Sequence, residues 1–171
     1  MYQRSRMALV GAGLGIVLTS GIALAAPADK NTTTLQLVGK GTQIYVCQKI
    51  QTNYGWALEG PSARLYDASG QVVGKHFFGP EWQANDGSEI KGKLLVASMA
   101  PGGRADAPWL VLRAQVLKAN GIFAQIKFVV RTNTKGGGVP STTCGSGQNG
   151  QTAAIPYTAT YTFFSSPSAS P

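Results

Sequence analysis

The sequence has a single histidine, His76, and only two cysteines, Cys47 and Cys144. A structural zinc site needs four ligands, mostly Cys and His, at characteristic spacings. These residues would need carboxylates to complete such a site, and no suitable spacing is present. The sequence also contains neither a Gly-x-Ser-x-Gly nucleophile motif nor a Gly-x-x-x-x-Gly-Lys-Ser/Thr phosphate loop. We therefore expect no metal site and no cofactor.

Acidic residues are scarce, with 7 Asp and Glu against 15 Lys and Arg, for a formal net charge of +8. A basic exported protein can bind a polyanionic polymer, such as a phosphate-rich envelope polymer or an acidic polysaccharide. The basic residues are scattered along the chain and form no run, however, which favours a solvated basic surface. No specific nucleic-acid partner is expected.

One long apolar stretch, residues 7–24, follows the basic residues Arg4 and Arg6. A short basic start, an apolar segment and small residues before a cleavage point are typical of a secretory signal peptide. We expect residues 1–25 to be removed, with cleavage as late as residue 28 as a second option. The alternative is a retained membrane anchor, because about 18 apolar residues can span a bilayer. Removal predicts a secreted or periplasmic protein with no membrane span after processing.

No segment keeps a 3.6-residue apolar period for three turns, so the sequence does not favour helices. Short runs rich in Val, Ile, Tyr, Phe and Thr alternate with turn signals, which is typical of β-strands. The predicted fold class is all-β, a mostly antiparallel β-sandwich or barrel with long irregular loops. We expect one β domain over residues 29–164 and a disordered tail at 165–171. The expected strands are 34–38, 42–50, 64–66, 72–78, 88–99, 109–117, 122–132 and 157–164.

Two cysteines in an exported chain most simply form one disulfide, here between Cys47 and Cys144. Cys144 lies in a long segment rich in Gly, Ser and Thr, residues 136–152, which the disulfide would tether. Two free thiols, or half of a metal site, are the alternatives.

The Asn120-Gly121 pair predicts a β-hairpin. Directly opposed residues point to the same face, so matching the apolar faces of the two strands requires a three-residue loop. This loop would pair Ala114 with Ile126 and place Arg113 opposite Lys127. Opposed like charges are mildly unfavourable, which indicates either a docked anion or side chains that splay into water.

The stretch 74–88 (GKHFFGPEWQANDGS) contains a candidate site cluster, His76, Trp82 and Asp86. In one interpretation His76 is an acid–base group or ligand, with Glu81 and Asp86 as its partners and Trp82 as a stacking platform. In the other, the Gly-Pro and Asp-Gly bends fold an irregular connection over the core, and His76 is a hydrogen-bonded structural residue. Trp56 and Trp82 lie in turn-rich regions and are predicted to be near the surface.

Several blocks occur in order along the sequence: Gly41-Thr42-Gln43-Ile44-Tyr45-Val46-Cys47-Gln48; Trp56-x-x-x-x-Pro61-x-Ala63-x-Leu65 followed by Asp67 and Gly70; Gly74-x-His76-x-x-Gly79-Pro80-x-Trp82 with Asp86-Gly87-Ser88; Pro108-Trp109-Leu110; Arg131-x-Asn133-Thr134-x-Gly136-Gly137; Cys144; and Pro156-Tyr157-Thr158-Ala159-x-Tyr161. Taken together, these blocks resemble the domain-of-unknown-function family 3455, small exported proteins of bacteria and fungi. The resemblance covers residues 39–164. It implies one exported domain with two matched cysteines and a recurring His76, Trp82 and Asp86 cluster, but it supplies no established activity to carry over. The sequence departs from the family pattern at Phe78, where a small residue is expected, and at Glu81, where Thr is expected.

These observations predict an exported protein that acts as a non-catalytic binding or envelope-associated β domain, with a polyanion or glycan as its ligand. The alternative is a small extracellular enzyme or metal-dependent protein with a site around His76 and Asp86. Because the sequence lacks a recognisable nucleophile motif, we favour the binding domain.

Overall fold

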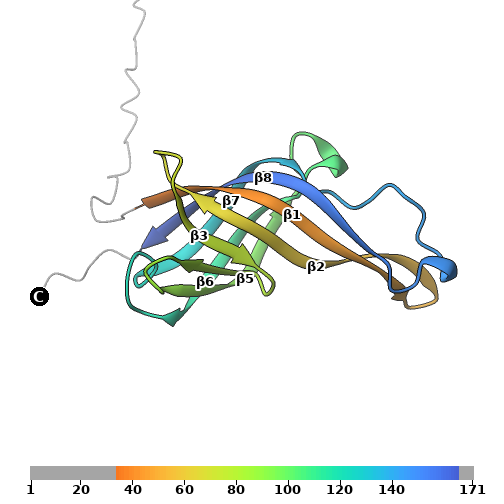
Figure 1. The fold of residues 1–171 in the computed structure, drawn as a ribbon, viewed down its shortest axis with the longest axis horizontal. Helices are drawn as coiled ribbons and strands as arrows, with labels where there is room; N and C mark the ends of the chain where they lie inside the picture. The colour runs from red at the N-terminus through yellow and green to blue at the C-terminus, as the bar shows by residue number, and fades with distance from the viewer. Residues whose placement is uncertain (1–33, 166–171) are drawn as a thin grey trace, which may run out of the picture.

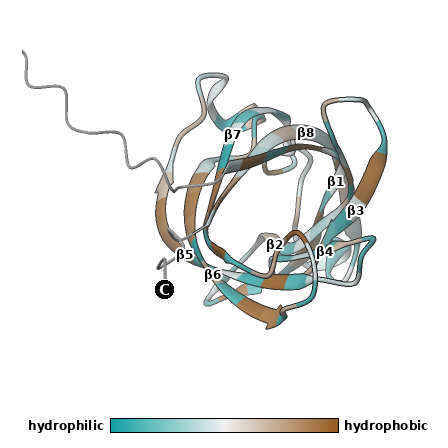
Figure 2. Ribbon diagram, turned by 90° about the vertical axis from the view of Figure 1, so that its left-hand side faces the viewer, coloured by the Kyte–Doolittle hydropathy of each residue, from teal (hydrophilic) through white to brown (hydrophobic). Residues whose placement is uncertain are grey.

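Residues 34–165, the part of the chain that the computed structural model describes, form eight strands that close into one barrel (Figure 1). Each strand pairs antiparallel with its neighbours in the chain, and β8 returns to β1. The predicted all-β, mostly antiparallel fold is therefore confirmed, as a barrel, and the strands form a ring when viewed end-on (Figure 2). The elements are β1 (Thr34–Ile50), β2 (Asn53–Tyr66), β3 (Val72–Phe77), β4 (Glu81–Ala84), β5 (Glu89–Ser98), η1 (Gly103–Ala105), β6 (Trp109–Lys118), β7 (Ile126–Gly136), η2 (Ser146–Gln148) and β8 (Thr152–Ser165).

The predicted signal peptide, residues 1–25, lies outside the described residues, and so does the chain from residue 166 onward. Ser165, predicted to begin the tail, is the last residue of β8. Neither of the short helices in the described region has the length and apolar character needed to cross a bilayer.

β1 runs without a break through Gly39 and Gly41, where the sequence predicted a connection between two strands. At both positions a side chain would collide with a neighbour. A Cβ at Gly39 would lie 2.6 Å from the Tyr161 ring, and one at Gly41 would meet the β2 backbone at Ser62. The two glycines therefore let β1 approach its neighbours closely while the large Tyr161 ring fills the barrel. β1, β2 and β8 also extend past the barrel as an arm (Figure 1).

The predicted disulfide is confirmed, with the Cα atoms of Cys47 and Cys144 5.6 Å apart. It ties the segment between β7 and β8 to the arm, where the Trp56 indole N–H also donates to the backbone oxygen of Thr142 (2.9 Å). The two cysteines are 97 residues apart in sequence. Closing a loop of this length in the unfolded chain stabilises the fold by roughly 4–5 kcal/mol in the chain-entropy model.

One end of the barrel is closed by buried aromatic side chains. Phe123, from the connection between β6 and β7, is fully buried, and its ring centroid lies 4.8 Å from that of Phe163. Two hydrogen bonds hold this connection across the barrel end. The Phe123 N–H donates to Ser88 Oγ (3.2 Å), and the Ile122 N–H donates to Asp86 Oδ2 (2.8 Å).

The predicted register of the β6–β7 hairpin is wrong by one residue. Leu112 pairs with Val129, and Arg113 pairs with Phe128 instead of Lys127. A one-residue shift moves each side chain to the other face of the sheet, so Val129 is buried whereas Phe128 is 39% exposed.

The register shift has its cause in contacts between segments that are distant in sequence. Because Phe123 is held in the barrel end, residues 119–125 form no strand and include a turn at 122–125, with Gly121 at the predicted positive φ (118°), and β7 begins only at Ile126. The ladder with β8 is irregular between Ile126 and Phe128. Such irregularities change which side chains face inward, and Arg131 is buried as a result.

The sequence analysis missed β4, which lies within the stretch 74–88. Its four residues pair with β3 and β5, so a strand stands where an irregular connection was expected. Trp82 at its centre is 1% exposed and belongs to the core, so its prediction as a surface residue is wrong. Trp56 is half-buried in the arm.

Candidate functional site

The barrel has a pocket of about 470 Å³ at the end opposite Phe123. Pockets that bind small ligands commonly measure about 300–1,000 Å³, so this mouth pocket has a suitable size. Its walls come from six strands and the turns beside them. The side chains that matter below are Gln43 of β1, Leu58 of β2, His76 of β3, Phe78 of the β3–β4 turn, Leu94 of β5 and Arg131 of β7.

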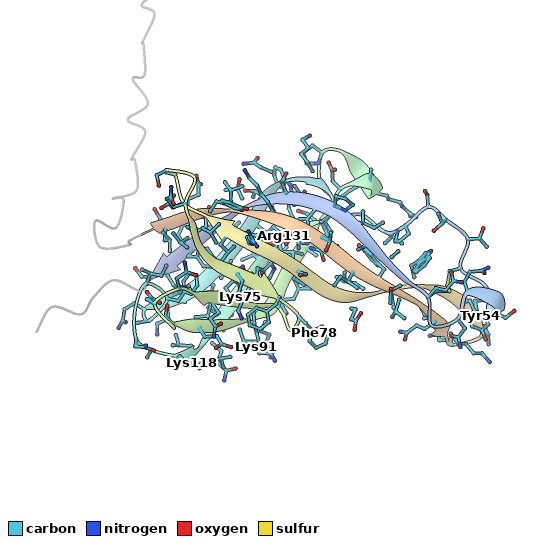
Figure 3. All side chains as sticks on the ribbon, viewed as in Figure 1. Tyr54, Lys75, Phe78, Lys91, Lys118 and Arg131 are labelled. Atoms are coloured by element: carbon cyan, nitrogen blue, oxygen red, sulfur yellow. A yellow bond between two sulfur atoms is a disulfide. The ribbon has the colours of Figure 1, made fainter. Side chains whose placement is uncertain are left out.

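The outer wall of the mouth pocket is apolar and open to solvent. Leu58, Phe78 and Leu94 line it and are 54%, 65% and 54% exposed. Phe78 lies at the β3–β4 turn (Figure 3). Exposed apolar groups that gather at a concave site are typical of ligand binding, because a ligand removes them from water.

Arg131 is the charged residue on the inner wall. Its side chain is only 6% exposed. Nε and Nη2 donate to the backbone oxygen of Pro108, at 3.0 and 2.8 Å. No carboxylate in residues 34–165 lies within ion-pair distance of Arg131. A buried charge is normally paired because removing it from water is costly, so this guanidinium is a candidate anion-binding group.

Gln43 is the second polar residue of the inner wall, and it is 1% exposed. Neither its amide nitrogen nor its amide oxygen has a hydrogen-bond partner among the described residues. The neighbouring Tyr45 does have one, since its hydroxyl donates to the backbone oxygen of Gly137 (2.8 Å). Buried polar atoms are nearly always hydrogen-bonded, so Gln43 offers a donor and an acceptor to a ligand in the mouth pocket.

His76 also lines the mouth pocket, but it is held as a neutral ring. It stacks on Trp82 with centroids 4.3 Å apart and planes at 5°, and its Nδ1–H donates to the Glu81 backbone oxygen (2.8 Å). Burial, opposed by the hydrogen bond to the Glu81 oxygen and aided by the Arg131 charge, lowers the pKa of His76 to about 3. An imidazole with this pKa is uncharged near neutral pH and keeps only its Nδ1 proton, so the site does not favour acid–base chemistry at His76.

Three tyrosine hydroxyls lie close enough to Arg131 to respond to its charge. Burial raises the pKa of Tyr45, Tyr157 and Tyr161, and Arg131 opposes the rise in each. The hydroxyl oxygens of Tyr157 and Tyr161 lie 3.1 Å apart. These tyrosines stay neutral, so they leave the positive charge of Arg131 uncompensated.

Asp86 does not join His76 and Trp82 in the structure. Its carboxylate accepts hydrogen bonds from the backbone and hydroxyl of Ser88, at 2.9 and 2.6 Å, and from the Ile122 N–H. These bonds, led by the one from the Ser88 hydroxyl, lower the pKa of Asp86. Asp86 therefore fixes the connection that closes the barrel, at the end away from the mouth pocket.

The opposed pair on which an anion contact was predicted, Arg113 with Lys127, does not form. Arg113 is exposed and its guanidinium carbon lies 5.7 Å from the centroid of the Phe128 ring. Within residues 34–165 no group of three or more His, Cys, Asp or Glu is placed to hold a metal ion.

Sequence reasoning missed Gln43 and Arg131 as candidate site residues. A signal for Gln43 was present, because it shares the two-residue alternation of Leu37, Tyr45 and Cys47, all of which are buried. Arg131 gave no such signal. The irregularity between Ile126 and Phe128 reverses which residues of β7 face inward, so the alternation read from Ile126 places Arg131 on the wrong face.

Comparison with known proteins gives one match. No curated protein matches the chain, and no solved structure does. The family model described as "Protein of unknown function (DUF3455)" matches residues 27–165, which is most of the chain and contains the whole barrel. This agrees with the resemblance found in the sequence blocks. The chain therefore belongs to the DUF3455 family.

Proposed function

We propose that this protein is a non-catalytic binding protein whose mouth pocket holds a small amphipathic anion, a carboxylate with an apolar body. The observation that carries the proposal is the burial of Arg131 without a carboxylate partner among residues 34–165. A ligand carboxylate would supply the missing negative charge, and hydrogen bonds to charged groups are worth about 1.5–3 kcal/mol.

The geometry of Arg131 suits a carboxylate. A guanidinium has five N–H donors in a plane, and its two bonds to Pro108 leave donors for a ligand. Arg binds carboxylates in a bidentate manner, through two parallel N–H···O bonds, which the single ammonium group of Lys cannot reproduce. The unpartnered amide of Gln43 lines the same pocket and can donate to a second ligand oxygen.

The apolar side chains of the mouth pocket suit the rest of such a ligand. Covering Leu58, Phe78 and Leu94 would remove apolar surface from water at about 25 cal/mol per Å². Glu59 also lines the pocket and is exposed, so it opposes anion binding weakly from the rim.

A binding role is favoured over the alternative of an enzyme or metal-dependent protein around His76 and Asp86. That alternative needs the two side chains to act together. Instead, His76 stacks on Trp82 beside the mouth pocket, whereas Asp86 is bonded to Ser88 and Ile122 at the closed end. The disulfide supports action after export, in a secreted or periplasmic location, because disulfides persist in oxidising compartments.

Isothermal titration calorimetry with decanoate and decan-1-ol tests the proposal. These probes have the same chain length and differ in the head group. We expect decanoate to bind and decan-1-ol to bind at least about tenfold more weakly. Arg131→Gln should weaken decanoate binding by about 10- to 100-fold, and Glu59→Gln should strengthen it slightly. Arg113→Gln is the matched control, because it removes an exposed arginine from the neighbouring strand.

Two results would contradict the proposal. One is equal affinity for decanoate and decan-1-ol, and the other is unchanged decanoate affinity in a folded Arg131→Gln variant. Circular dichroism decides whether that variant is folded. If it is not, Gln43→Leu provides the test, since this substitution keeps the volume of the side chain and removes its polar atoms. Decanoate affinity that is unchanged in Gln43→Leu would then count against the proposed site.

A further inference from the structure

A second candidate binding surface lies on the outside of the barrel, away from the mouth pocket. We propose that three cations aligned across β1, β2 and β3, here named the basic row (Lys40, Arg64 and Lys75), bind an acidic polysaccharide. This inference does not depend on the ligand of the mouth pocket. In the fold, basic residues that are scattered along the sequence form one line of positive charge that crosses the strands.

The pairing of the strands produces the basic row. Lys40 pairs directly with Arg64, and Arg64 pairs directly with Lys75. All three side chains are exposed and alternate with inward residues such as Gly41 and Ala63. Adjacent strands are about 4.8 Å apart, so the row presents three positive charges at short, regular intervals across the strands.

The basic row lacks nearby carboxylates that could neutralise it. None of its three cations forms an ion pair with any residue in the range 34–165. The closest acidic residue in the same cross-strand register is Glu89 of β5. Gln83 of β4 lies between it and Lys75, and the carboxylate of Glu89 is close enough to interact with the Lys75 charge. Glu89 is already bound to Lys118 (2.7 Å) and Gln83 (2.9 Å). β1, β3, β7 and β8 contain no acidic residue at all.

Opposed like charges make this arrangement unfavourable in the absence of an anion. Aromatic rings hold two of the cations in place, since the Lys40 ammonium lies 4.8 Å from the centroid of Tyr66 and the Lys75 ammonium 5.2 Å from that of Phe77. The register also continues from Lys40 through Thr158 of β8 to Lys135 of β7. A polyanion that crosses the strands would therefore meet a fourth cation.

The surroundings of the basic row favour a polysaccharide over other polyanions. A shallow groove of about 520 Å³ contains the row and Ser62, and the hydroxyls of Thr42 and Thr158 lie beside it on the same face. Hydroxyls suit sugar hydroxyls, whereas single-stranded nucleic acid needs open aromatic rings on which bases stack. The ring in this groove, Tyr66, is covered by Lys40.

Binding to polygalacturonate, measured by biolayer interferometry with neutral dextran as the reference, tests this inference. The triple variant Lys40→Gln, Arg64→Gln, Lys75→Gln removes the basic row. Its control, Lys49→Gln, Lys93→Gln, Lys127→Gln, removes the same net charge from exposed positions elsewhere. At an ionic strength of about 0.15 M, where the Debye length is about 8 Å, we expect the row variant to lose about fivefold in affinity per cation, roughly a hundredfold in total. The control should lose less than about fivefold, since distant charges are screened.

Three outcomes would overturn the inference. The first is an equal loss of affinity in the row variant and in the control, which would mean that only net charge matters. The second is tighter binding to single-stranded DNA or to vesicles containing phosphatidylserine than to polygalacturonate, which would assign the surface to another class of partner. The third is binding to neutral dextran as tight as to polygalacturonate. All substituted residues are exposed, so both variants should fold, and decanoate binding in the mouth pocket should be unchanged in each.

Discussion

Because His76 is buried, we predict that protonation of this one side chain in the unfolded state makes the folded protein markedly less stable in mild acid. The pKa of His76 is lowered to about 3 in the folded protein, from an ordinary value of 6.5. Between these pH values the unfolded chain binds a proton that the folded protein does not. Stability therefore falls as the pH drops below 6.5 and stops changing through this residue below about 3. From pH 7 to pH 4.5, this linkage removes about 2.5 kcal/mol.

The variant His76→Phe isolates this contribution. Its ring keeps the stack on Trp82 and cannot take up a proton. It loses the hydrogen bond from Nδ1–H to Glu81, so we expect it to be about 1 kcal/mol less stable than the natural protein at pH 7. At pH 4.5 the order should reverse, with the variant more stable by about 1.5 kcal/mol.

Urea unfolding followed by tryptophan fluorescence, at pH 7.0, 5.5 and 4.5, measures both proteins. Carboxylates that titrate in this range affect both proteins alike, so the difference between them reports on His76. Parallel stability–pH curves for the two proteins would refute the reasoning, because His76 would then have a nearly normal pKa. That result would also restore the interpretation of His76 as an acid–base group near neutral pH.

Two further predictions concern the closed end and the arm. Asp86→Ala should lower the free energy of unfolding by about 1–2 kcal/mol, as for the loss of a capping side chain. Decanoate affinity should be unchanged, because Asp86 bonds to Ser88 and Ile122 at the closed end of the barrel, far from the mouth pocket. Loss of decanoate binding with intact stability would instead place Asp86 in the site. Replacing Cys47 and Cys144 together by Ser should cost up to about 4–5 kcal/mol and increase hydrogen exchange in residues 137–151. Unchanged exchange in that segment would show that its backbone bonds suffice, such as that from the Cys47 N–H to the oxygen of Gln151.

The contrast between Asp86 and His76 explains why sequence proximity misled the search for a site. The two residues lie ten positions apart in one stretch, and each has the side chain that an acid–base pair needs. β4 separates them, however, and carries the chain from the mouth pocket back to the closed end of the barrel. Two side chains that are close in sequence can lie far apart when a strand between them carries the chain to the other end of the barrel. With only four residues, β4 was too short to be recognised from the sequence.

The sequence by itself determined the features that depend on local patterns. Alternating apolar residues and turn signals gave the all-β class, and the presence of only two cysteines gave the disulfide between Cys47 and Cys144. The positive φ of Gly121 follows from the requirements of its turn in the same way. Each of these inferences uses a property of one segment, or of the whole composition, and needs no knowledge of which strand pairs with which.

Only the tertiary structure decided which side chains meet. Arg131 faces the mouth pocket because Phe123 is anchored by Ser88, 35 residues earlier, and the resulting irregularity reverses the face of β7. The basic row exists because the registers of β1, β2 and β3 bring Lys40, Arg64 and Lys75 into line. Side chains alternate along a strand by local geometry, but register is set by contacts between distant segments. A shift of one residue would have changed both surfaces.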